Sequence, residues 1–452
     1  MLNLFLSKVI ETKVGDYIYD ALNNKIISLP KNISIEIKKN IFSENYFKFI
    51  KENNLRDFRE YVNFKINCNN FYSDEELNDL LNTSMNSITL CTTENCNLRC
   101  EYCCYVRKYQ DNNYKLKNMS KATAFKAIDF LMKNSSSTNR IYLGFYGGES
   151  FLNFDLIKSC VNYCEKKYPF KIPNYHTTTN GLLLGKDDVV NFIINNNFKV
   201  LVSLDGTKES HDEHRINKFK KPSFDIVFSN LNKLYQKNPK FFKNNISFSA
   251  VRTPANCSKS QLNFLDNLCK ERLFVADVDQ TKYFTEILKN KLKSKKIKKV
   301  DITEFNFFKH DILKKMKNYH YVLSREGKVS KLFCPGTYCI PGLKKNFISP
   351  DGKIILCEKV DERNPIYILG DVFCGINFEK IRNLYEITLQ QVQKCRNCWA
   401  SRLADFCFKE IFNLTPEHCE QCSKSVYFNL QYYIEKIKDN KDNITYLENV
   451  DI

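Results

Sequence analysis

From residue 87 to residue 278, short apolar segments alternate with longer segments of helical periodicity. The short segments are rich in β-branched and aromatic residues, and the longer ones repeat apolar residues every three or four positions. Six strands alternating with helices predict an α/β fold with a parallel sheet, built either as a partial (β/α)6 barrel or as an open doubly wound sheet. The predicted strands are Ile88–Thr92, Arg140–Tyr146, Tyr175–Thr179, Lys199–Leu204, Ile246–Val251 and Leu273–Val278. The predicted helices are Lys121–Lys133, Phe154–Lys167, Lys186–Asn195, Ser223–Gln236 and Ser258–Lys270.

Residues 1–85 have a different pattern, without this alternation. Gly15–Asp20 and Lys25–Leu29 flank a turn that contains two Asn residues, and they predict a β-hairpin. Helical spacing of apolar residues follows over Ile33–Phe42 and Glu44–Tyr61. This part of the chain is therefore predicted to be a small α+β module, and no group of its residues suggests catalysis.

The length of 452 residues corresponds to about three domains of the usual size. After residue 333 the chain becomes rich in Cys and in turn signals such as Pro-Gly and Pro-Asp-Gly. We therefore predict three consecutive domains, formed by residues 1–85, by the α/β segment 86–320 and by the Cys-rich segment 321–452.

The cysteine content indicates metal chemistry. The chain has 19 Cys, an odd number, and they cluster in residues 91–104 and 334–422. No segment resembles a secretory signal, and no apolar stretch approaches the ~18 residues of a membrane-spanning helix. We expect a cytoplasmic protein whose thiols are reduced rather than paired in disulfides. Clustered thiols in such a compartment predict metal or iron–sulfur ligation.

The formal net charge of +18 suits a polyanionic partner, but the chain is also rich in Lys, Asn and Ile throughout. The Lys-rich run Lys291–Lys299 fits a solvated helix or linker face better than a nucleic-acid patch. The charge therefore changes the functional prediction little, and neither a membrane nor a nucleic-acid partner is expected.

Three cysteines follow the first predicted strand with the spacing C-x3-C-x2-C: Cys96, Cys100 and Cys103. Three thiolates this close together can hold three irons of a cubane cluster and leave the fourth iron open to a substrate. The alternative is a zinc knuckle in which Cys91 or Cys104 is the fourth ligand. Structural zinc sites usually use two paired C-x2-C arms, and no second arm is close in the sequence. The spacing therefore favours an iron–sulfur cluster.

This region resembles the radical S-adenosylmethionine (radical SAM) superfamily, whose hallmark is C-x3-C-x2-C with an aromatic residue, here Tyr102, before the last Cys. Further motifs of the family follow, each at a predicted strand end, where barrel-type sites are assembled. They are Gly147-Gly148-Glu149, Thr178-Thr179-Asn180-Gly181, Ser203-Leu204-Asp205-Gly206, and His211-Asp212 with Arg215. The resemblance implies a partial (β/α)6 radical SAM barrel.

The resemblance also implies that these residues bind S-adenosylmethionine beside one catalytic 4Fe-4S cluster. The zwitterionic ligand needs a carboxylate for its ammonium group, which Glu149 would supply, and a donor for its carboxylate, either Ser203 or Arg215. In the family's mechanism the reduced cluster passes an electron to the sulfonium, the S–C5′ bond breaks, and the 5′-deoxyadenosyl radical takes a hydrogen atom from the substrate. The expected cofactor-binding residues are Tyr102, Gly147, Gly148, Glu149, Thr179, Asn180, Ser203, Asp205 and Arg215.

The later cysteines resemble the SPASM domain, which carries two auxiliary 4Fe-4S clusters in radical enzymes that modify peptides and proteins. Residues 339–357 match its opening, but Ala404 stands where the domain has a Cys. The alternatives are that Cys422 replaces the missing ligand or that the second cluster is absent or incomplete. In the first case one cluster is held by Cys334, Cys339, Cys357 and Cys407, and the other by Cys395, Cys398, Cys419 and Cys422. The remaining cysteines, Cys374 among them, are expected to be structural thiols.

Stretches such as Cys395-Arg-Asn-Cys-Trp-Ala400 resemble clostridial-type Cys-rich peptide maturases. The resemblance implies an enzyme that installs a crosslink, with a Cys thioether as the expected bond, in a ribosomally made precursor peptide, with a flavodoxin- or ferredoxin-type protein as electron donor. Residues 1–85 would be a winged-helix-like module that captures the leader of the peptide as an added strand on the hairpin edge.

Other functions stay open. The substrate could be a folded protein, as in sulfatase or quinohemoprotein maturation, or the product could be a carbon–carbon crosslink. Outside this class, a basic winged-helix module could belong to a nucleic-acid-binding iron–sulfur redox sensor. A sensor has no need of the Gly-Gly-Glu motif or of the Ser-Leu-Asp strand end, so the motifs favour an enzyme.

Overall fold

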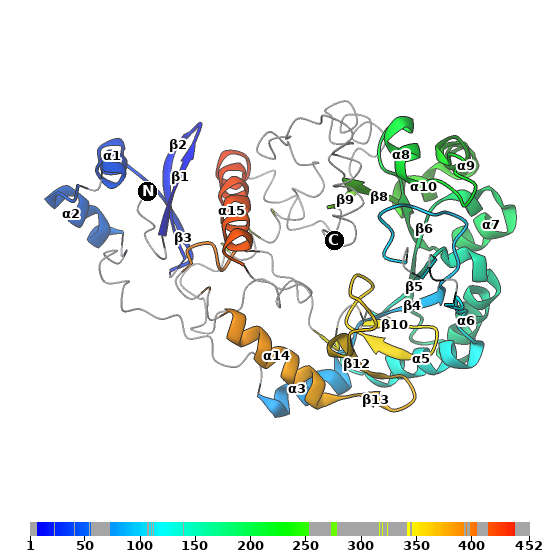
Figure 1. Cartoon of the computed structure of the whole chain (residues 1–452). Coiled ribbons are helices and arrows are strands. Elements are labelled where there is room, and N and C mark those ends of the chain that lie inside the picture. The colour runs from blue at the N-terminus through cyan, green and yellow to red at the C-terminus, as the bar shows by residue number, and fades with distance from the viewer. Residues whose placement is uncertain are drawn as a thin grey trace. The chain divides into compact units, whose positions relative to one another are not determined.

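A computed structural model (Figure 1) gives the structure of the chain. It describes residues 7–21, 23–39, 41–53, 55, 73–105, 108–109, 111, 113–138, 140–252, 273–277, 316, 319, 323, 341–343, 346–392, 395, 398–404 and 415–438. The predicted helix Ser258–Lys270 lies outside the described residues.

The chain divides into two compact units, which are described separately. The sheet unit consists of residues 76–311 and 340–381, and the terminal unit of residues 1–75, 312–339 and 382–452. These units cut across the three consecutive segments expected from the sequence, because residues 346–376 add strands to the sheet that begins at residue 87.

The sheet unit is built on a ten-stranded sheet with the order β13-β12-β11-β10-β4-β5-β6-β7-β8-β9. Strands β4 to β9 follow the order of the sequence, and each pairs in parallel with the next. They are the six predicted strands, so the predicted parallel α/β core is confirmed. Their bounds are Ser87–Thr93 (β4), Tyr142–Gly147 (β5), Asn174–Thr179 (β6), Lys199–Ser203 (β7), Ile246–Arg252 (β8) and Leu273–Asp277 (β9).

From β4 to β8, helices connect successive strands and lie along one side of them in Figure 1. The first begins after Ser120, whose hydroxyl accepts a hydrogen bond from Thr123 N and so caps the helix. The two seven-residue helices were not expected, since fewer than two turns give little periodicity. The helices are α5 (Lys121–Lys133), α6 (Phe154–Lys167), α7 (Asp187–Asn195), α8 (Lys208–His214), α9 (Phe224–Lys237) and α10 (Pro239–Asn245), with short 3-10 turns η2 (Ser150–Asn153) and η3 (Leu182–Gly185).

Apolar side chains of the strands form the core of this unit. Leu90, Phe145, Val202 and Phe248, on four different strands, are fully buried or nearly so. Removing these side chains from water drives the packing of the strands and helices. The carboxyl ends of the strands, where the polar motifs lie, are thereby held together at one edge of the sheet.

Four short strands extend the sheet beyond β4. Strand β10 (Asn346–Ile348) pairs in parallel with β4, and β11 (Lys353–Ile355), β12 (Ile368–Asp371) and β13 (Gly375–Ile376) follow in antiparallel order. Gly352, with φ of +92°, closes the turn between β10 and β11. The sequence predicts this Pro-Asp-Gly turn, but strands of two to four residues are too short for an alternating pattern to be recognised.

The terminal unit contains a three-stranded antiparallel sheet of β1 (Ser7–Thr12), β2 (Gly15–Asp20) and β3 (Lys25–Ser28). Strands β2 and β3 are the predicted hairpin, which is therefore confirmed, whereas β1 was not expected. Helices α1 (Lys31–Lys39) and α2 (Glu44–Glu52) follow. Their apolar faces pack with the hairpin in one core, which contains Ile18, Ile27, Leu29, Ile33, Tyr46, Phe49, Ile50 and Leu55.

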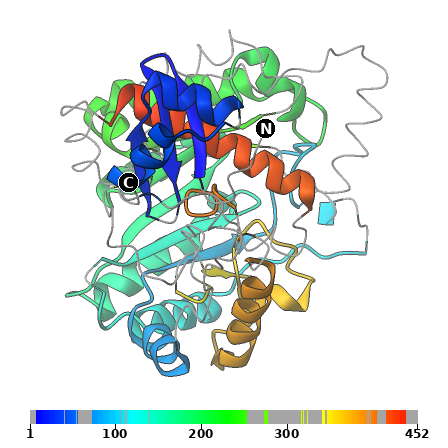
Figure 2. The same cartoon turned by 90° about the vertical axis from the view of Figure 1, so that its left-hand side faces the viewer.

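Helix α15 (Pro416–Lys436) lies beside β1 in Figures 1 and 2. Side chains of α15 accept hydrogen bonds from the outer backbone at β1: Glu11 N, in the strand, donates to Tyr427 Oη at 3.1 Å, and Lys13 N, just after the strand, donates to Glu435 Oε1 at 2.9 Å. This edge of the small sheet is therefore covered by α15.

The structure also describes α3 (Asp74–Thr83), α14 (Phe378–Val392) and the 3-10 turn η5 (Pro365–Tyr367). Among the helices of the described residues, none combines the length and the apolar character needed to cross a bilayer.

Candidate functional site

The loop after β4 presents the three cysteines of the C-x3-C-x2-C motif. Backbone N–H groups point at two of the sulfurs: Leu98 N lies 3.3 Å from Cys96 Sγ, and Tyr105 N lies 3.4 Å from Cys103 Sγ. Cys100, between them, is buried. Hydrogen bonds to sulfur stabilise thiolates and are a means by which proteins tune iron–sulfur clusters. The loop therefore fits a thiolate-ligated cluster.

Without a metal, these thiols would hold their protons at neutral pH. Burial raises the pKa of Cys96 and of Cys100 to about 12, and the neighbouring thiols contribute in the same direction. A cation that binds the sulfurs stabilises the thiolate form, which burial alone disfavours. Binding of a metal cluster to these cysteines must therefore release protons.

The backbone of the loop is fixed by Arg99. Its Nη1 donates to Cys96 O at 2.7 Å and to Leu98 O at 2.8 Å. The guanidinium carbon also lies 4.3 Å from the centre of the Tyr109 ring. The carbonyls of the loop are thus turned toward Arg99, which leaves the N–H groups free to face the sulfurs.

The zinc alternative requires Cys91 or Cys104 as a further ligand, and the side chain of Cys104 forms a hydrogen bond with the motif residue Cys103. The sulfur of Cys91 is buried and lies 3.5 Å from Tyr105 Oη, and the side chain of Cys104 is exposed. Within the described part of the chain, no three His, Cys, Asp or Glu side chains could hold a single metal ion. A cubane cluster does not need such convergence, because each thiolate binds a different iron.

Gly147 and Gly148 allow two backbone segments to meet. Gly148 N donates to Thr93 O at 2.8 Å, and Glu149 N donates to Asn95 O at 2.8 Å. A Cβ at Gly147 would lie 2.1 Å from Thr93 O, and one at Gly148 would lie 2.3 Å from Asn95 O. Only glycine fits such an approach, so the end of β5 holds the start of the cysteine loop in place.

The carboxylate of Glu149 is buried, with 1% of the residue exposed. It accepts hydrogen bonds from Thr179 Oγ1 at 2.9 Å, from Asn180 N at 2.8 Å and from Phe151 N at 3.2 Å. Burial raises its pKa to about 7, although these donors act in the opposite direction. The Thr179-Asn180 motif therefore meets the Gly-Gly-Glu motif through this side chain. Asn180 Nδ2 in turn lies 3.7 Å from Cys96 Sγ.

Asp205, after β7, joins two other side chains of the predicted site, Arg215 and Tyr102. Arg215 Nε donates to Asp205 Oδ2 at 2.8 Å and Arg215 Nη2 donates to Oδ1 at 3.0 Å, while Tyr102 Oη donates to Oδ2. The guanidinium carbon of Arg215 lies 5.3 Å from the centre of the Tyr102 ring. Asp205 and Arg215 are buried, Tyr102 is half-buried, and the charge of Arg215 is paired with that of Asp205.

The His-Asp pair of the sequence has a supporting role. Asp205 N donates to His211 Nδ1 at 3.4 Å, and His211 Nε2 lies 3.0 Å from Ser223 Oγ. Burial lowers the pKa of His211 to about 3, so the ring is neutral with its proton on Nε2. Asp212 Oδ1 accepts hydrogen bonds from the N–H groups of Ser223 and Phe224 at 2.9 Å each, at the start of α9.

His214 is a residue that sequence reasoning missed. Its Nδ1 lies 3.2 Å from Glu101 Oε2, and its ring centre is 5.8 Å from that of Tyr102. Among the described residues no hydrogen-bond partner is present for the buried His214 Nε2. The only sequence feature that could have marked His214 as a site residue is its position next to Arg215.

In the terminal unit, Cys395 and Cys398 form a turn in which Cys398 N donates to Cys395 O at 3.0 Å. Cys419 and Cys422 are three positions apart at the start of α15 and share one face of it. The two pairs meet, since Cys398 Sγ lies 3.9 Å from Ser423 Oγ. Burial raises the pKa of Cys398, and the neighbouring Cys419 adds to the effect.

The other predicted auxiliary ligands are only partly described. Cys357 lies in the sheet unit just after β11 and is half-buried. Cys334, Cys339 and Cys407 lie outside the described residues. Cys374 is exposed in the turn between β12 and β13.

Comparisons with known proteins identify the central segment. The sequence profile of the radical SAM superfamily matches residues 90–247. The chain is 35% identical over 142 residues to a cysteine-type anaerobic sulfatase-maturating enzyme of Clostridium novyi (strain NT), covering 31% of this chain and 37% of the relative. It is 36% identical over 143 residues to a serine-type anaerobic sulfatase-maturating enzyme of Bacteroides thetaiotaomicron, covering 31% of this chain and 34% of that enzyme. The chain thus spans little more than a third of the length of these relatives.

Solved structures share the fold over a larger part of the chain. The structure of a histidine-tagged form of anSMEcpe with bound AdoMet has a TM-score of 0.56 at 17% identity and covers 81% of this chain and 96% of its own. Native anSMEcpe with bound AdoMet and the Kp18Cys peptide has a TM-score of 0.54 at 17% identity, over 80% of this chain and 99% of its own. The superfamily profile and the cysteine loop after β4 together show that residues 90–247 of this chain are a radical SAM domain.

Proposed function

We propose that the chain is a radical SAM peptide maturase that cleaves S-adenosylmethionine reductively and installs a crosslink, a Cys thioether, in a ribosomally made peptide. The observation that carries the proposal is the cysteine loop after β4, in which N–H groups face the sulfurs of Cys96 and Cys103. When bound, the 4Fe-4S cluster and S-adenosylmethionine supply an electron and a 5′-deoxyadenosyl radical that takes a hydrogen atom.

The residues around the loop would hold S-adenosylmethionine beside the cluster. The carboxylate of Glu149 would face the ammonium group while keeping its three internal hydrogen bonds. Ser203, half-buried at the end of β7, is the better donor for the carboxylate of the ligand, because the charge of Arg215 is already paired with Asp205. Tyr102 directly precedes Cys103 in the sequence and donates a hydrogen bond to Asp205. This bond would hold the backbone at Cys103, the third cysteine of the motif, in place.

Formation of a thioether removes two hydrogens from the peptide, one from a carbon and one from the Cys sulfur. The first leaves as a hydrogen atom in 5′-deoxyadenosine, and the second as a proton with one electron left over. This electron needs an acceptor, which an auxiliary cluster would provide. Cys395, Cys398, Cys419 and Cys422 would hold one such cluster, and the contact between Cys398 and Ser423 supports this assignment. Cys334, Cys339, Cys357 and Cys407 would hold the other.

The terminal unit would bind the leader of the peptide as an added strand. Its sheet has the order β1-β2-β3, and α15 covers the outer edge of β1. The leader would therefore add to the β3 side. Hydrogen exchange of residues 25–28 should slow when the peptide is added, and unchanged exchange in the presence of bound peptide would contradict this location.

A second candidate function is the oxidation of a Cys or Ser in a sulfatase to formylglycine. It is favoured by the two sulfatase-maturating enzymes among the relatives of this chain. The products distinguish the two functions. A thioether lowers the mass of the peptide by two hydrogens and consumes one thiol without forming a carbonyl group. Formylglycine formation from Cys replaces sulfur by oxygen and also removes two hydrogens, and from Ser it removes two hydrogens; in both cases the product is an aldehyde.

The test is to incubate the anaerobically reconstituted chain with S-adenosylmethionine, a reductant and a Cys-rich precursor peptide encoded beside its gene. We expect 5′-deoxyadenosine and a peptide that has lost two hydrogens and one reactive thiol. A sulfatase peptide converted to the aldehyde, with the precursor peptide unchanged, would establish the second function instead.

A further inference from the structure

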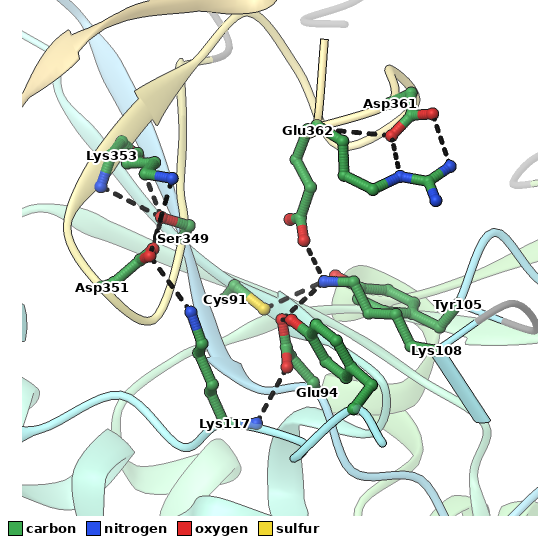
Figure 3. Close-up of polar contacts among 12 residues, drawn as sticks. Cys91, Glu94, Tyr105, Lys108, Lys117, Ser349, Asp351, Lys353, Asp361 and Glu362 are labelled. Carbon is green, nitrogen blue, oxygen red and sulfur yellow. Dashed lines mark hydrogen bonds and ion pairs between the residues drawn. The ribbon is translucent and has the colours of Figure 1, made fainter. Parts of the chain in front are cut away.

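The segment that follows the three cysteines is held to the protein by one buried carboxylate. Glu94 lies directly after β4, and 1% of the residue is exposed. Its Oε1 accepts a hydrogen bond from Tyr114 Oη at 3.0 Å, and its Oε2 accepts one from Lys117 N at 2.8 Å. Lys108 Nζ lies 2.5 Å from Oε1. Figure 3 shows Lys108 and Lys117 converging on Glu94 from this segment.

Lys108 also reaches a second carboxylate far along the chain. Its ammonium group pairs with Glu362, which lies 254 positions later (Figure 3). The side chain of Lys108 is 14% exposed and that of Glu362 is 25% exposed. Burial alone would lower the pKa of Lys108, but the hydrogen bonds to Glu362 and Glu94 raise it above its usual value. One cation thus bridges two carboxylates in a largely buried site.

Glu362 belongs to the loop 356–367, which connects β11 with β12 and also carries Cys357. The loop is closed at its base, where Leu356 N donates to Tyr367 O at 2.9 Å. Asp361 and Arg363 pair with each other at 2.7 Å and are exposed. Figure 3 shows Asp361 turned away from the Lys108 site. Lys108 is therefore a buried charged contact between this loop and the segment after the catalytic cysteines.

We propose that Lys108 is a positioning residue that fastens the loop of Cys357 to the segment that follows Cys96, Cys100 and Cys103. The two cysteine-bearing parts of the sheet unit are thereby kept in one arrangement. The proposal rests on the proposed function only in treating these cysteines as cluster ligands.

The charges explain why the loop depends on Lys108. Without the ammonium group, Glu94 and Glu362 would be two carboxylates facing each other in a site that excludes much of the water. Glu94 would keep its bonds to Tyr114 and Lys117. Glu362 lacks such support from the described part of this segment, so its loop should open while the sheet stays intact.

The test is hydrogen exchange of the anaerobically reconstituted full chain, followed by mass spectrometry. In Lys108→Met, amides of residues 356–367 should exchange about tenfold faster or more, because a largely buried pair has lost one partner. Lys108→Arg keeps the charge and should restore exchange to within about twofold of the natural chain.

Lys117→Met is the matched control from the same segment. Lys117 pairs with Asp351 at 3.2 Å, but the two side chains are 48% and 37% exposed. Exposed pairs contribute little, so exchange of residues 356–367 should change less than about twofold. Equal exchange in the natural chain and in Lys108→Met, or an equal effect of Lys117→Met, would overturn the proposal.

Glu362→Gln provides a second route if Lys108→Met does not fold. It removes the charge of the loop but leaves Glu94 paired with Lys108, and it should also speed exchange of residues 356–367. Unchanged exchange in this variant would likewise contradict the proposal. The measurement needs neither S-adenosylmethionine nor peptide, so a failure of the proposed function would not alter its outcome.

Discussion

Glu149 has three hydrogen-bond donors around its carboxylate and still titrates near neutral pH, because burial disfavours the charged form more than the donors favour it. The folded chain without bound cofactor therefore holds a proton on this group at a pH where the unfolded chain has lost it. A ligand that brings an ammonium group to Glu149 would reverse this preference.

The first prediction follows from this pKa. The native pKa of about 7 lies above the usual value of 4.5, so the native state binds more protons between these limits. The unfolding free energy of the chain without cluster or cofactor should therefore fall by about 3 kcal/mol as the pH rises through this window. Glu149→Gln cannot titrate and should show a flatter profile in chemical denaturation. Parallel profiles for the two chains would contradict the assignment.

Single residues also show where sequence reasoning stops. The motifs predicted that Glu149 and Asp205 lie at strand ends and that Arg215 follows, because the residue types and their spacing are local signals. The pairing of Arg215 with Asp205 depends on the turn made by α8, and the pairing of Lys108 with Glu362 joins residues 254 positions apart. No local pattern encodes such contacts.

At the scale of elements, Asp212 makes the start of α9 depend on α8. Its carboxylate accepts hydrogen bonds from the backbone N–H groups of Ser223 and Phe224, which have no partner within α9. Asp212→Ala should lower the unfolding free energy by about 1 kcal/mol, as measured by chemical denaturation. Asp225→Ala is the control, since Asp225 pairs with Lys208 on the surface and should cost less than about 0.5 kcal/mol. Equal losses would show that the cap has no special role.

The start of α15 is the element on which the second auxiliary cluster depends. If Cys422 replaces the ligand missing at Ala404, the chain binds about 12 irons after reconstitution, at four for each of three cubanes. Cys422→Ala should then lose up to about four irons, with a matching change in the cluster spectrum.

Cys374→Ala is the control for this variant, because Cys374 is exposed in the turn between β12 and β13. It should leave the iron content unchanged. Unaltered iron and spectra in Cys422→Ala would show that Cys422 is not a ligand, and the second cluster would then have an open site.

Between residues 87 and 277, the predicted strands and the four longer helices that the structure describes agree with it to within about two residues, because repeats of strand and helix give a strong periodic signal. The helix expected over Glu44–Tyr61 was predicted too long, since α2 ends at Glu52. The strands β10 to β13 could not be predicted in this way. Each is held by pairing with a neighbour, in the case of β10 with β4, and not by a pattern of its own. The same is true of β1, whose edge is covered by α15.

At the scale of the whole molecule, residues distant in sequence complete each unit. Residues 340–381 join the sheet that begins at β4, and residues 382–452 share a unit with the amino-terminal sheet. Deleting residues 1–85 would therefore remove β1 from α15 as well as removing the predicted leader-binding module. Peptide binding is better tested with substitutions on the intact chain.

The central claim is that Cys96, Cys100 and Cys103 hold the cluster that cleaves S-adenosylmethionine. The most direct measurement compares 5′-deoxyadenosine formation and iron content in the reconstituted natural chain and in the variant with all three replaced by Ala. We expect the variant to form no 5′-deoxyadenosine and to lose about four irons, while the remaining iron stays bound. Undiminished 5′-deoxyadenosine formation by the variant would contradict this claim.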